Sequence, residues 1–273
     1  MNKGPIGVFD SGYGGLTVLN AIVNQLPQYD YLYLGDNARA PYGPRSFETV
    51  YQYTLECVQW FFNQGCPLVI LACNTASAKA LRTIQQNDLA HIGPNKRVLG
   101  VIRPTTEIIG NLSKTKQVGI LGTTGTILSN SYPIEINKFY PEITVHQQAC
   151  PMWVPLIENN EYQTEGAAYF IKKDINLLLA QSNNIDTILL ACTHYPLLMQ
   201  QIQQFVPKGI NILSQGKIVA DSLLHYLERH VEIRENCSKN GQLSFFTTDS
   251  VEDFDNHAAN FFGKSVKSSH IDL

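Results

Sequence analysis

Two cysteines in this chain each lie at the point where an apolar run ends and polar residues follow. The two runs read Val69-Ile-Leu-Ala-Cys73-Asn74-Thr75 and Ile188-Leu-Leu-Ala-Cys192-Thr193-His194. This pattern predicts a buried strand that ends where a helix begins, the place where open α/β sheets gather ligands. Unpaired N–H groups at such a helix start lower the pKa of a thiol and can hold a carboxylate. One cysteine there would most often be a small buried hydrophobe, but two in matching places favour chemistry.

Two thiols that face each other across a carbon atom permit a two-base reaction. One thiolate removes a proton while the opposite thiol delivers one to the other face, so the centre inverts without a cofactor. A redox pair is the alternative, although the chain has no C-x-x-C motif. No P-loop or Cys/His metal spacing occurs, and Gly12-Tyr-Gly14-Gly15 lacks the spacing of dinucleotide sites. We therefore expect neither a nucleotide cofactor nor a metal.

The elements that position these residues alternate between short Val, Ile and Leu runs and stretches of 3.6-residue periodicity, which is typical of βαβ units with a parallel sheet. One helix is predicted after the N-cap Ser46 and a second over about 164–182 with Thr164 as its cap. The apolar face of the first is expected to carry Phe47, Tyr51, Leu55, Val58 and Phe62. Strands are predicted near 5–10, 31–35, 67–73, 98–101, 117–121, 143–149, 186–191, 210–213 and 243–247.

The sequence contains a diverged internal repeat. Ile6-Gly-Val-Phe-Asp-Ser11 aligns with Val118-Gly-Ile-Leu-Gly-Thr123, and the run that ends at Cys73 aligns with the run that ends at Cys192. The simplest explanation is two related α/β domains, whose cysteines meet in a cleft between them. The segment after residue 210 holds no third copy, and its residues alone do not decide where it packs.

Composition narrows the class of protein. The 273 residues suit one large α/β domain or two of about 100 to 150 residues. The net charge is −3 with no block of like charge, so we expect no nucleic-acid partner. The longest apolar run, Leu68 to Cys73, is far shorter than the roughly 20 residues of a membrane span. Six sparse cysteines and an N-terminus unlike a signal or transit peptide predict free thiols and a cytoplasmic location.

Five segments of the chain carry a further signal. They are Phe9-Asp-Ser-Gly-Tyr-Gly-Gly-Leu16, Gly35-Asp-Asn-Ala-Arg-Ala-Pro-Tyr-Gly43, Ala72-Cys-Asn-Thr-Ala-Ser77, Cys150-Pro-Met-Trp-Val-Pro-Leu-Ile-Glu158 and Ala191-Cys-Thr-His-Tyr-Pro196. In these segments, which occur in the family's order and separations, the chain resembles the glutamate racemase family, within the cofactor-independent aspartate/glutamate racemase superfamily. The resemblance spans residues 6 to about 225. The residues around the two cysteines are similar to the glutamate-specific branch, since aspartate-acting relatives usually differ after each cysteine.

The resemblance implies two pseudo-symmetric, doubly wound α/β domains, each with a central parallel sheet, and an active site in the inter-domain cleft. The C-terminal segment then returns to the first domain, so we expect residues 1–97 plus 210–273 in one domain and 98–209 in the other. The implied activity is racemisation of glutamate without a cofactor, supplying D-glutamate for peptidoglycan synthesis and so for the cell wall and cell shape. The oligomeric state stays open, with a homodimer among the options.

The resemblance also implies individual roles. Cys73 would take the α-proton from D-glutamate and Cys192 from L-glutamate, each acting as acid when the other is base. The expected catalytic helpers are Asp10, His194 and Glu158. The expected substrate contacts are Asp10, Ser11, Tyr42, Gly43, Asn74, Thr75, Thr123, Thr193 and His194. The alternative to ligand binding is helix capping for Asp10, Ser11, Asn74 and Thr75, and a plain Pro-Tyr-Gly turn for Tyr42 and Gly43.

Electrostatics restricts the roles that the expected catalytic helpers can have beside the two thiols. A carboxylate close to a thiolate raises the pKa of the thiol, so Asp10 and Glu158 fit a proton partner or an amine orienter. A protonated His194 would instead favour a thiolate at Cys192, which predicts different pH dependence for the two directions. Asp36 also falls in a family segment, and a turn-forming aspartate explains it nearly as well. The other cysteines are Cys57, Cys66, Cys150 and Cys237, and we expect them to be structural because none has a base beside it in sequence. Cys237 is expected in a polar loop.

One segment departs from many family members. Where they have an aspartate before a late glycine, this chain reads Leu213-Ser-Gln-Gly216, for which we expect a local structural effect and unchanged activity. Two rival functions remain at this point. One is a racemase for aspartate or another amino acid, and the other is a two-lobed amino-acid-binding or thiol-switch protein without turnover.

Overall fold

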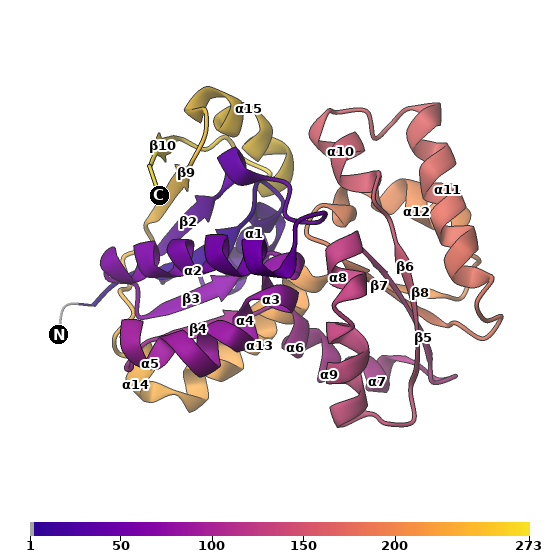
Figure 1. Cartoon of the computed structure of the whole chain (residues 1–273), viewed down its shortest axis with the longest axis horizontal. Helices are drawn as coiled ribbons and strands as arrows, with labels where there is room; N and C mark the ends of the chain where they lie inside the picture. Colours follow the sequence, from indigo (N-terminus) through magenta and orange to yellow (C-terminus); the bar gives the residue numbers. More distant parts are fainter. Residues whose placement is uncertain (1–2) are drawn as a thin grey trace.

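The computed structural model describes residues 3–273 and has two α/β lobes, which lie side by side in Figure 1. In this part of the chain ten strands form two sheets, and every paired strand runs parallel to its neighbour. The first sheet has the order β10 (Ser268–His270), β9 (Leu243–Thr247), β2 (Tyr31–Gly35), β1 (Ile6–Asp10), β3 (Leu68–Leu71) and β4 (Arg97–Gly100). The second has the order β6 (Thr144–Ala149), β5 (Gln117–Gly122), β7 (Thr187–Ala191) and β8 (Asn211–Leu213).

The predicted repeat is confirmed by strand order and by register. The order β2-β1-β3-β4 in the first lobe matches β6-β5-β7-β8 in the second. Gly7 of β1 pairs with Val69 of β3, and the aligned Gly119 of β5 pairs with Ile188 of β7. The central strands of the two halves therefore pair in the same register, and the predicted fold class is confirmed.

Helices cover both faces of each sheet (Figure 1), and buried apolar residues lie on both sides of the central strands. The helices of the first lobe and its connections are α1 (Gly15–Gln25), α2 (Phe47–Asn63), α3 (Asn74–Lys79), α4 (Leu81–Thr83), α5 (Leu89–Ile92), α13 (Gln215–Arg229), α14 (Val231–Arg234) and α15 (Val251–Phe262). Those of the second are α6 (Ile102–Thr106), α7 (Ile109–Leu112), α8 (Thr124–Leu128), α9 (Ser131–Phe139), α10 (Trp153–Glu158), α11 (Glu165–Leu179) and α12 (Met199–Phe205). Short non-α turns are η1 (Asn37–Arg39), η2 (Ile84–Asp88) and η3 (Tyr195–Leu198).

The chain crosses between the lobes twice. It leaves the first sheet after β4 through α6, and it returns after β8 through α13, which packs against α1 and α6. The expected boundary at 97/98 divides β4, which pairs with β3 in the first sheet. The expected boundary at 209/210 assigns β8 to the first domain, although β8 pairs with β7 in the second sheet. We propose instead that the domains divide after Gly100 and after Leu213.

Local sequence signals account for the two predicted helices. Ser46 caps α2 by accepting a hydrogen bond from the Thr49 N–H at 3.1 Å, and Thr164 caps α11 by accepting from the Ala167 N–H at 3.2 Å. The predicted apolar face of α2 was wrong at its start, where Phe47 is 53% exposed. The buried stripe is rotated toward Val50, Thr54, Cys57, Val58, Phe61 and Phe62, so Phe47 falls on the solvent side of the first turn.

Two other features differ from the sequence predictions. Strand β10 was not predicted, because Ser268–His270 has no run of apolar residues and gains its strand form by pairing with β9. Cys237 was expected in a polar loop but is fully buried, and its Sγ donates to the Ile233 carbonyl oxygen at 3.3 Å. Among residues 3–273, no helix combines the length and apolar character that a membrane crossing requires.

Two glycines at equivalent places let a helix approach each central strand. A Cβ added to Gly7 would lie 2.6 Å from Cδ1 of Phe61 in α2, and one added to Gly119 would lie 2.7 Å from Cδ2 of Leu178 in α11. These contacts are too close for a methyl group, so each glycine sets the spacing between sheet and helix.

We expect Gly7→Ala to lower the free energy of unfolding by about 1–3 kcal/mol, because the Phe61 ring must move. The matched control is Gly166→Ala in the first turn of α11, where the nearest atom to the new Cβ is 3.7 Å away. That change should leave the stability unchanged or raise it by up to about 1 kcal/mol. Urea unfolding measures both, and equal effects would contradict the packing argument.

Candidate active site

A cavity of about 150 Å³ lies between the lobes, at the carboxyl ends of β1, β3, β5 and β7. That volume holds several waters or a small molecule. The first lobe contributes Ser11, Ala40, Pro41, Tyr42, Gly43, Pro44, Cys73, Asn74 and Thr75. The second contributes Thr123, Thr124, Cys150, Pro151, Val154, Pro155, Glu158, Cys192, Thr193 and His194.

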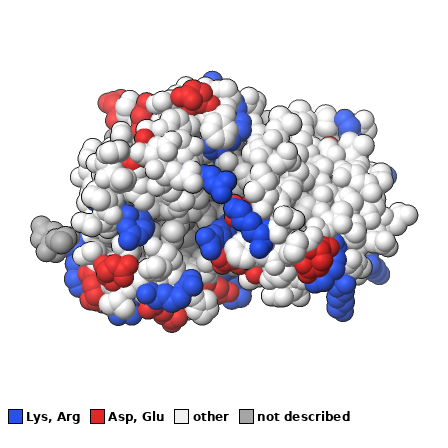
Figure 2. Space-filling view, turned by 60° about the horizontal axis from the view of Figure 1, so that its bottom comes forward, with Lys and Arg blue, Asp and Glu red and all other residues white. Residues whose placement is uncertain are grey.

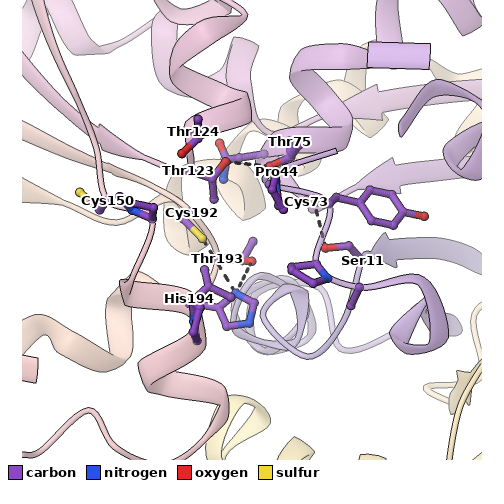
Figure 3. Close-up of a pocket in the computed structure, with 18 of the residues that line it drawn as sticks. Ser11, Pro44, Cys73, Thr75, Thr123, Thr124, Cys150, Cys192, Thr193 and His194 are labelled. Atoms are coloured by element: carbon purple, nitrogen blue, oxygen red, sulfur yellow. Dashed lines mark hydrogen bonds between the residues drawn. The ribbon is translucent and has the colours of Figure 1, made fainter. Parts of the chain in front are cut away.

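Cys73 and Cys192 line this cavity from different lobes. In Figure 3, Cys73 lies beside Ser11 on the right of the cavity, and Cys192 lies near His194 on the left. Each cysteine follows a central strand, β3 or β7, and each is 6% exposed. Because the strands share one register, the two thiols occupy equivalent positions of the repeat.

The Cys73 thiol is the N-cap of α3. Its Sγ accepts a hydrogen bond from the Ala76 N–H at 3.4 Å and lies 3.6 Å from the Ser11 Oγ. Burial and the charge of Asp10 nevertheless raise the pKa of Cys73 to about 12, against the lowering effect of these two contacts. Cys73 is therefore a neutral thiol near neutral pH.

The Cys192 thiol has a histidine beside it. The Nδ1 atom of His194 lies 3.9 Å from Sγ of Cys192, and its Nε2 atom lies 3.0 Å from Oε1 of Glu158. Burial lowers the pKa of His194, but its hydrogen bonds with Cys192 and Glu158 outweigh burial and raise that pKa to about 10. His194 is therefore a cation near neutral pH, and only one of the two thiols has a positive charge in contact.

Asp10 lies behind the cavity and not on its surface. It is fully buried, its Oδ1 accepts from the Gly12 N–H at 3.0 Å, and its Oδ2 accepts from the Thr193 hydroxyl at 3.3 Å. Burial raises the pKa of Asp10, while the positive His194 and the hydrogen bonds oppose that rise. Asp10 therefore acts on the cavity through Thr193, which lines it.

The glycines of Gly12-Tyr-Gly14-Gly15 make room for these contacts. A Cβ on Gly14 would lie 2.2 Å from the Thr193 Oγ1 and 2.4 Å from the His194 Nδ1, and one on Gly15 would lie 2.5 Å from Cβ of Asp10. The turn after β1 therefore packs its bare backbone against the residues that follow β7.

Asp36 fixes the loop that carries Tyr42 and Gly43. The Tyr42 hydroxyl donates to the Asp36 carboxylate, which also accepts from Arg39 Nε at 2.7 Å and from the Thr248 hydroxyl at 2.8 Å. Tyr42 is 1% exposed, so its ring anchors the loop in the first lobe. A turn-forming role alone does not describe Asp36, because its side chain holds three other residues.

Helix starts and hydroxyl groups form the upper wall of the cavity in Figure 3. Thr75 lies at the start of α3 in the first lobe, and Thr123 is the N-cap of α8 in the second. The distance between their hydroxyl oxygens is 2.9 Å. The described lining includes no Lys or Arg, so N–H groups, hydroxyls and the His194 cation are its anion-binding groups. Within residues 3–273 no cluster of three or more His, Cys, Asp or Glu side chains could hold a metal ion.

All of the expected catalytic and substrate-contact residues line the cavity except Asp10. Asp10 is connected to the cavity through its hydrogen bond with Thr193. Sequence reasoning missed Thr124, Val154 and the proline-rich edge of the cavity, although Val154 lies within a segment that carries the family resemblance. Cys150 also lines the cavity, but its sulfur points away from Cys192 in Figure 3. Burial and Asp174 raise the pKa of Cys150, which agrees with a structural thiol.

Charged side chains of both signs lie on the face of the molecule that Figure 2 shows. On the face in Figure 2, basic and acidic residues are interspersed, and much of the second lobe carries neither. The described residues on that face therefore form no extended region of one charge sign.

Comparisons with known proteins agree with the geometry. A family model described as Asp/Glu/Hydantoin racemase matches residues 6–223. A glutamate racemase from Sulfurihydrogenibium sp. strain YO3AOP1 is 37% identical over 270 residues, which is 98% of this chain and 97% of that protein. A glutamate racemase from Streptococcus suis is 35% identical over 274 residues and covers 100% of both chains.

Solved structures extend the similarity to the whole fold. Glutamate racemase isoform RacE1 from Bacillus anthracis superposes with a TM-score of 0.90 at 33% identity, over 100% of this chain and 99% of that one. Glutamate racemase from Francisella tularensis, solved in complex with D-glutamate, gives 0.88 at 28% identity over 100% and 98%. The chain therefore belongs to the Asp/Glu/Hydantoin racemase family, among the glutamate racemases, and is an amino-acid racemase.

Proposed function

We propose that this protein interconverts L- and D-glutamate by a two-base mechanism in which Cys73 and Cys192 act on opposite faces of Cα. The observation that carries the proposal is the pair of buried thiols at equivalent ends of β3 and β7, on two sides of one small cavity. The similarity to glutamate racemases over the full chain supports glutamate as the substrate.

The proton transfers balance without another reactant. With L-glutamate bound, the Cys192 thiolate takes the Cα proton, so an S–H bond forms as the C–H bond breaks and the electron pair stays on the substrate. The Cys73 thiol then gives its proton to the opposite face of Cα, which yields D-glutamate and leaves the negative charge on Cys73. The reverse direction uses the same steps with the roles exchanged.

The surroundings of the thiols give each helper a role in this proposal. The imidazolium of His194 stabilises negative charge on Cys192, and Glu158 holds that imidazolium by its second nitrogen. Asp10 positions Thr193, and its negative charge favours the neutral Cys73 thiol, the form that gives its proton to Cα. The starts of α3 and α8, with Ser11, Asn74, Thr75 and Thr123, hold the carboxylates, and the loop at Tyr42 and Gly43 closes the cavity.

The difference between the two thiols can make kcat and KM differ between the two directions, but it cannot make kcat/KM differ between them. L- and D-glutamate have equal free energies in water, so kcat/KM must be the same in both directions at every pH. The expected asymmetry in pH dependence therefore belongs to kcat and KM taken separately. We further propose that the enzyme works in the cytoplasm and supplies D-glutamate for peptidoglycan, the role that the family resemblance implies.

Incubation with L-glutamate in D2O plus a chelator should give D-glutamate that carries deuterium at Cα. Cys73→Ser and Cys192→Ser should each lower net inversion by at least about 10³-fold, because a serine hydroxyl is too weak an acid to replace the thiol. The matched control is Cys66→Ala, a buried cysteine outside the cavity lining, which should keep its activity.

Circular dichroism of glutamate and mass spectrometry measure the inversion and the label. Faster turnover of aspartate than of glutamate would favour the rival racemase specificity. Tight binding of glutamate without exchange at Cα would contradict racemisation altogether.

The raised pKa of His194 makes the stability depend on pH. The folded protein keeps this proton up to a pH of about 10, whereas the unfolded chain releases it near 6.5. The stabilisation is thus fully present below 6.5, and it is lost as the pH rises toward 10. Urea unfolding between these limits should show a smaller decline in His194→Gln than in the wild type.

The control for this measurement is His91→Gln, which changes an exposed histidine in α5 and should keep the wild-type decline. Parallel pH profiles for the wild type and His194→Gln would show that His194 is not the group responsible.

A further inference from the structure

A closed ring of three side-chain hydrogen bonds lies directly behind the cavity wall. The Asn74 Nδ2 donates to the Gln215 Oε1 at 2.7 Å, the Gln215 Nε2 donates to the Tyr132 hydroxyl at 2.8 Å, and the Tyr132 hydroxyl donates to the Asn74 Oδ1 at 2.6 Å. Each member both donates and accepts, so the bonds run in one direction around the ring. The members are 3%, 4% and 0% exposed for Asn74, Gln215 and Tyr132.

Because the ring is buried, the loss of any one of its hydrogen bonds has a large free-energy cost. A buried amide or hydroxyl that loses its partner costs about 1–3 kcal/mol, and hydrogen bonds in a closed chain polarise one another. Asn74 can make four hydrogen bonds, and the ring uses one N–H and one lone pair. The remaining N–H and lone pair are free for a ligand, because Asn74 lines the cavity next to Cys73.

The ring joins three parts of the chain that are distant in sequence. Asn74 begins α3 in the first lobe, Tyr132 lies in α9 of the second lobe, and Gln215 begins α13 where the chain returns to the first lobe. Gln215 Nε2 also lies 2.9 Å from the Val101 carbonyl oxygen and 3.1 Å from the Thr105 hydroxyl, on the outgoing crossing at α6. A single amide thus contacts both crossings between the lobes and the residue after Cys73.

We propose that Tyr132 and Gln215 are positioning residues, which hold the Asn74 amide in the orientation that binds the substrate beside Cys73. This inference rests on the proposed racemase function. Without the ring, the Asn74 side chain is free to rotate about its χ angles, and a misplaced contact of this kind costs up to about 100-fold in rate. The segment Leu213–Gly216, where this sequence departs from many family members, supplies the contact, so a change there alters activity and not only local structure.

The test is a double-mutant cycle on kcat/KM for glutamate racemisation. Tyr132→Phe keeps the packing of the ring and removes only the hydroxyl, and it should lower kcat/KM by about 10- to 100-fold. In an Asn74→Ala background the same change should have an effect of about twofold or less, because the amide that the hydroxyl orients is gone.

The matched control is Tyr140→Phe. Tyr140 follows α9 and donates its hydroxyl to the Glu107 carbonyl oxygen at 2.7 Å, which is a comparable hydrogen bond outside the ring. This variant should keep kcat/KM within about twofold in either background, even where urea unfolding shows a stability loss as large as that of Tyr132→Phe. If Tyr132→Phe does not fold, Gln215→Met removes the amide at similar volume and takes its place in the cycle.

The outcomes separate this inference from the proposed function. Wild-type protein that fails to racemise glutamate would overturn both. Active wild-type protein in which Tyr132→Phe costs the same with and without Asn74, or costs nothing, would overturn the positioning role and leave the racemase standing. A loss that disappears in the Asn74→Ala background, with Tyr140→Phe unaffected, supports it.

Discussion

The cost of ionising a sulfur atom away from water governs the arrangement of this cavity. Both thiols are almost fully buried, so each needs neighbours to carry a negative charge. Cys73 has a helix N–H, a hydroxyl and a buried carboxylate nearby, and its pKa stays high. Cys192 has the His194 cation, which Glu158 holds in place. A nearly symmetric scaffold therefore carries an unsymmetric charge distribution.

The duplicated fold explains why two thiols from distant parts of the chain line one small cavity. Equal register in the two sheets places Cys73 and Cys192 at the same height above their strands, and the lobes face each other across the cavity. The following helices break this symmetry, since α3 begins immediately after Cys73 while only the short η3 follows Cys192. A histidine takes the place near Cys192 that helix N–H groups take near Cys73.

The apolar strands, all except β10, and most of the cavity could be predicted from the sequence for one physical reason. Buried parallel strands are continuous Val, Ile and Leu runs, and the residues that follow them must meet at one edge of the sheet. Cys73, Cys192 and Thr123 are such residues, so their position follows from local pattern and the repeat.

Other features depend on contacts that no local pattern encodes. The Gln215 side chain reaches Asn74 and Tyr132 across two lobes, and Asp10 turns toward Thr193 and not into the cavity. The exposure of Phe47 depends on how α2 is rotated against the sheet, which one helix turn of sequence does not fix. The domain boundaries that we propose differ from the expected ones for a similar reason, since strand pairing and not strand sequence assigns β4 and β8 to their sheets.

The first lobe is assembled from both ends of the chain. Strand β9 pairs with β2, and α13 and α15 pack against α1, whereas every strand of the second sheet lies within residues 117–213. During synthesis from the N-terminus, the second lobe can complete its sheet while the first still exposes an open strand edge and an uncovered helix. The covered edge of the first sheet therefore depends on residues 243–270, whereas the second sheet needs no residue after Leu213.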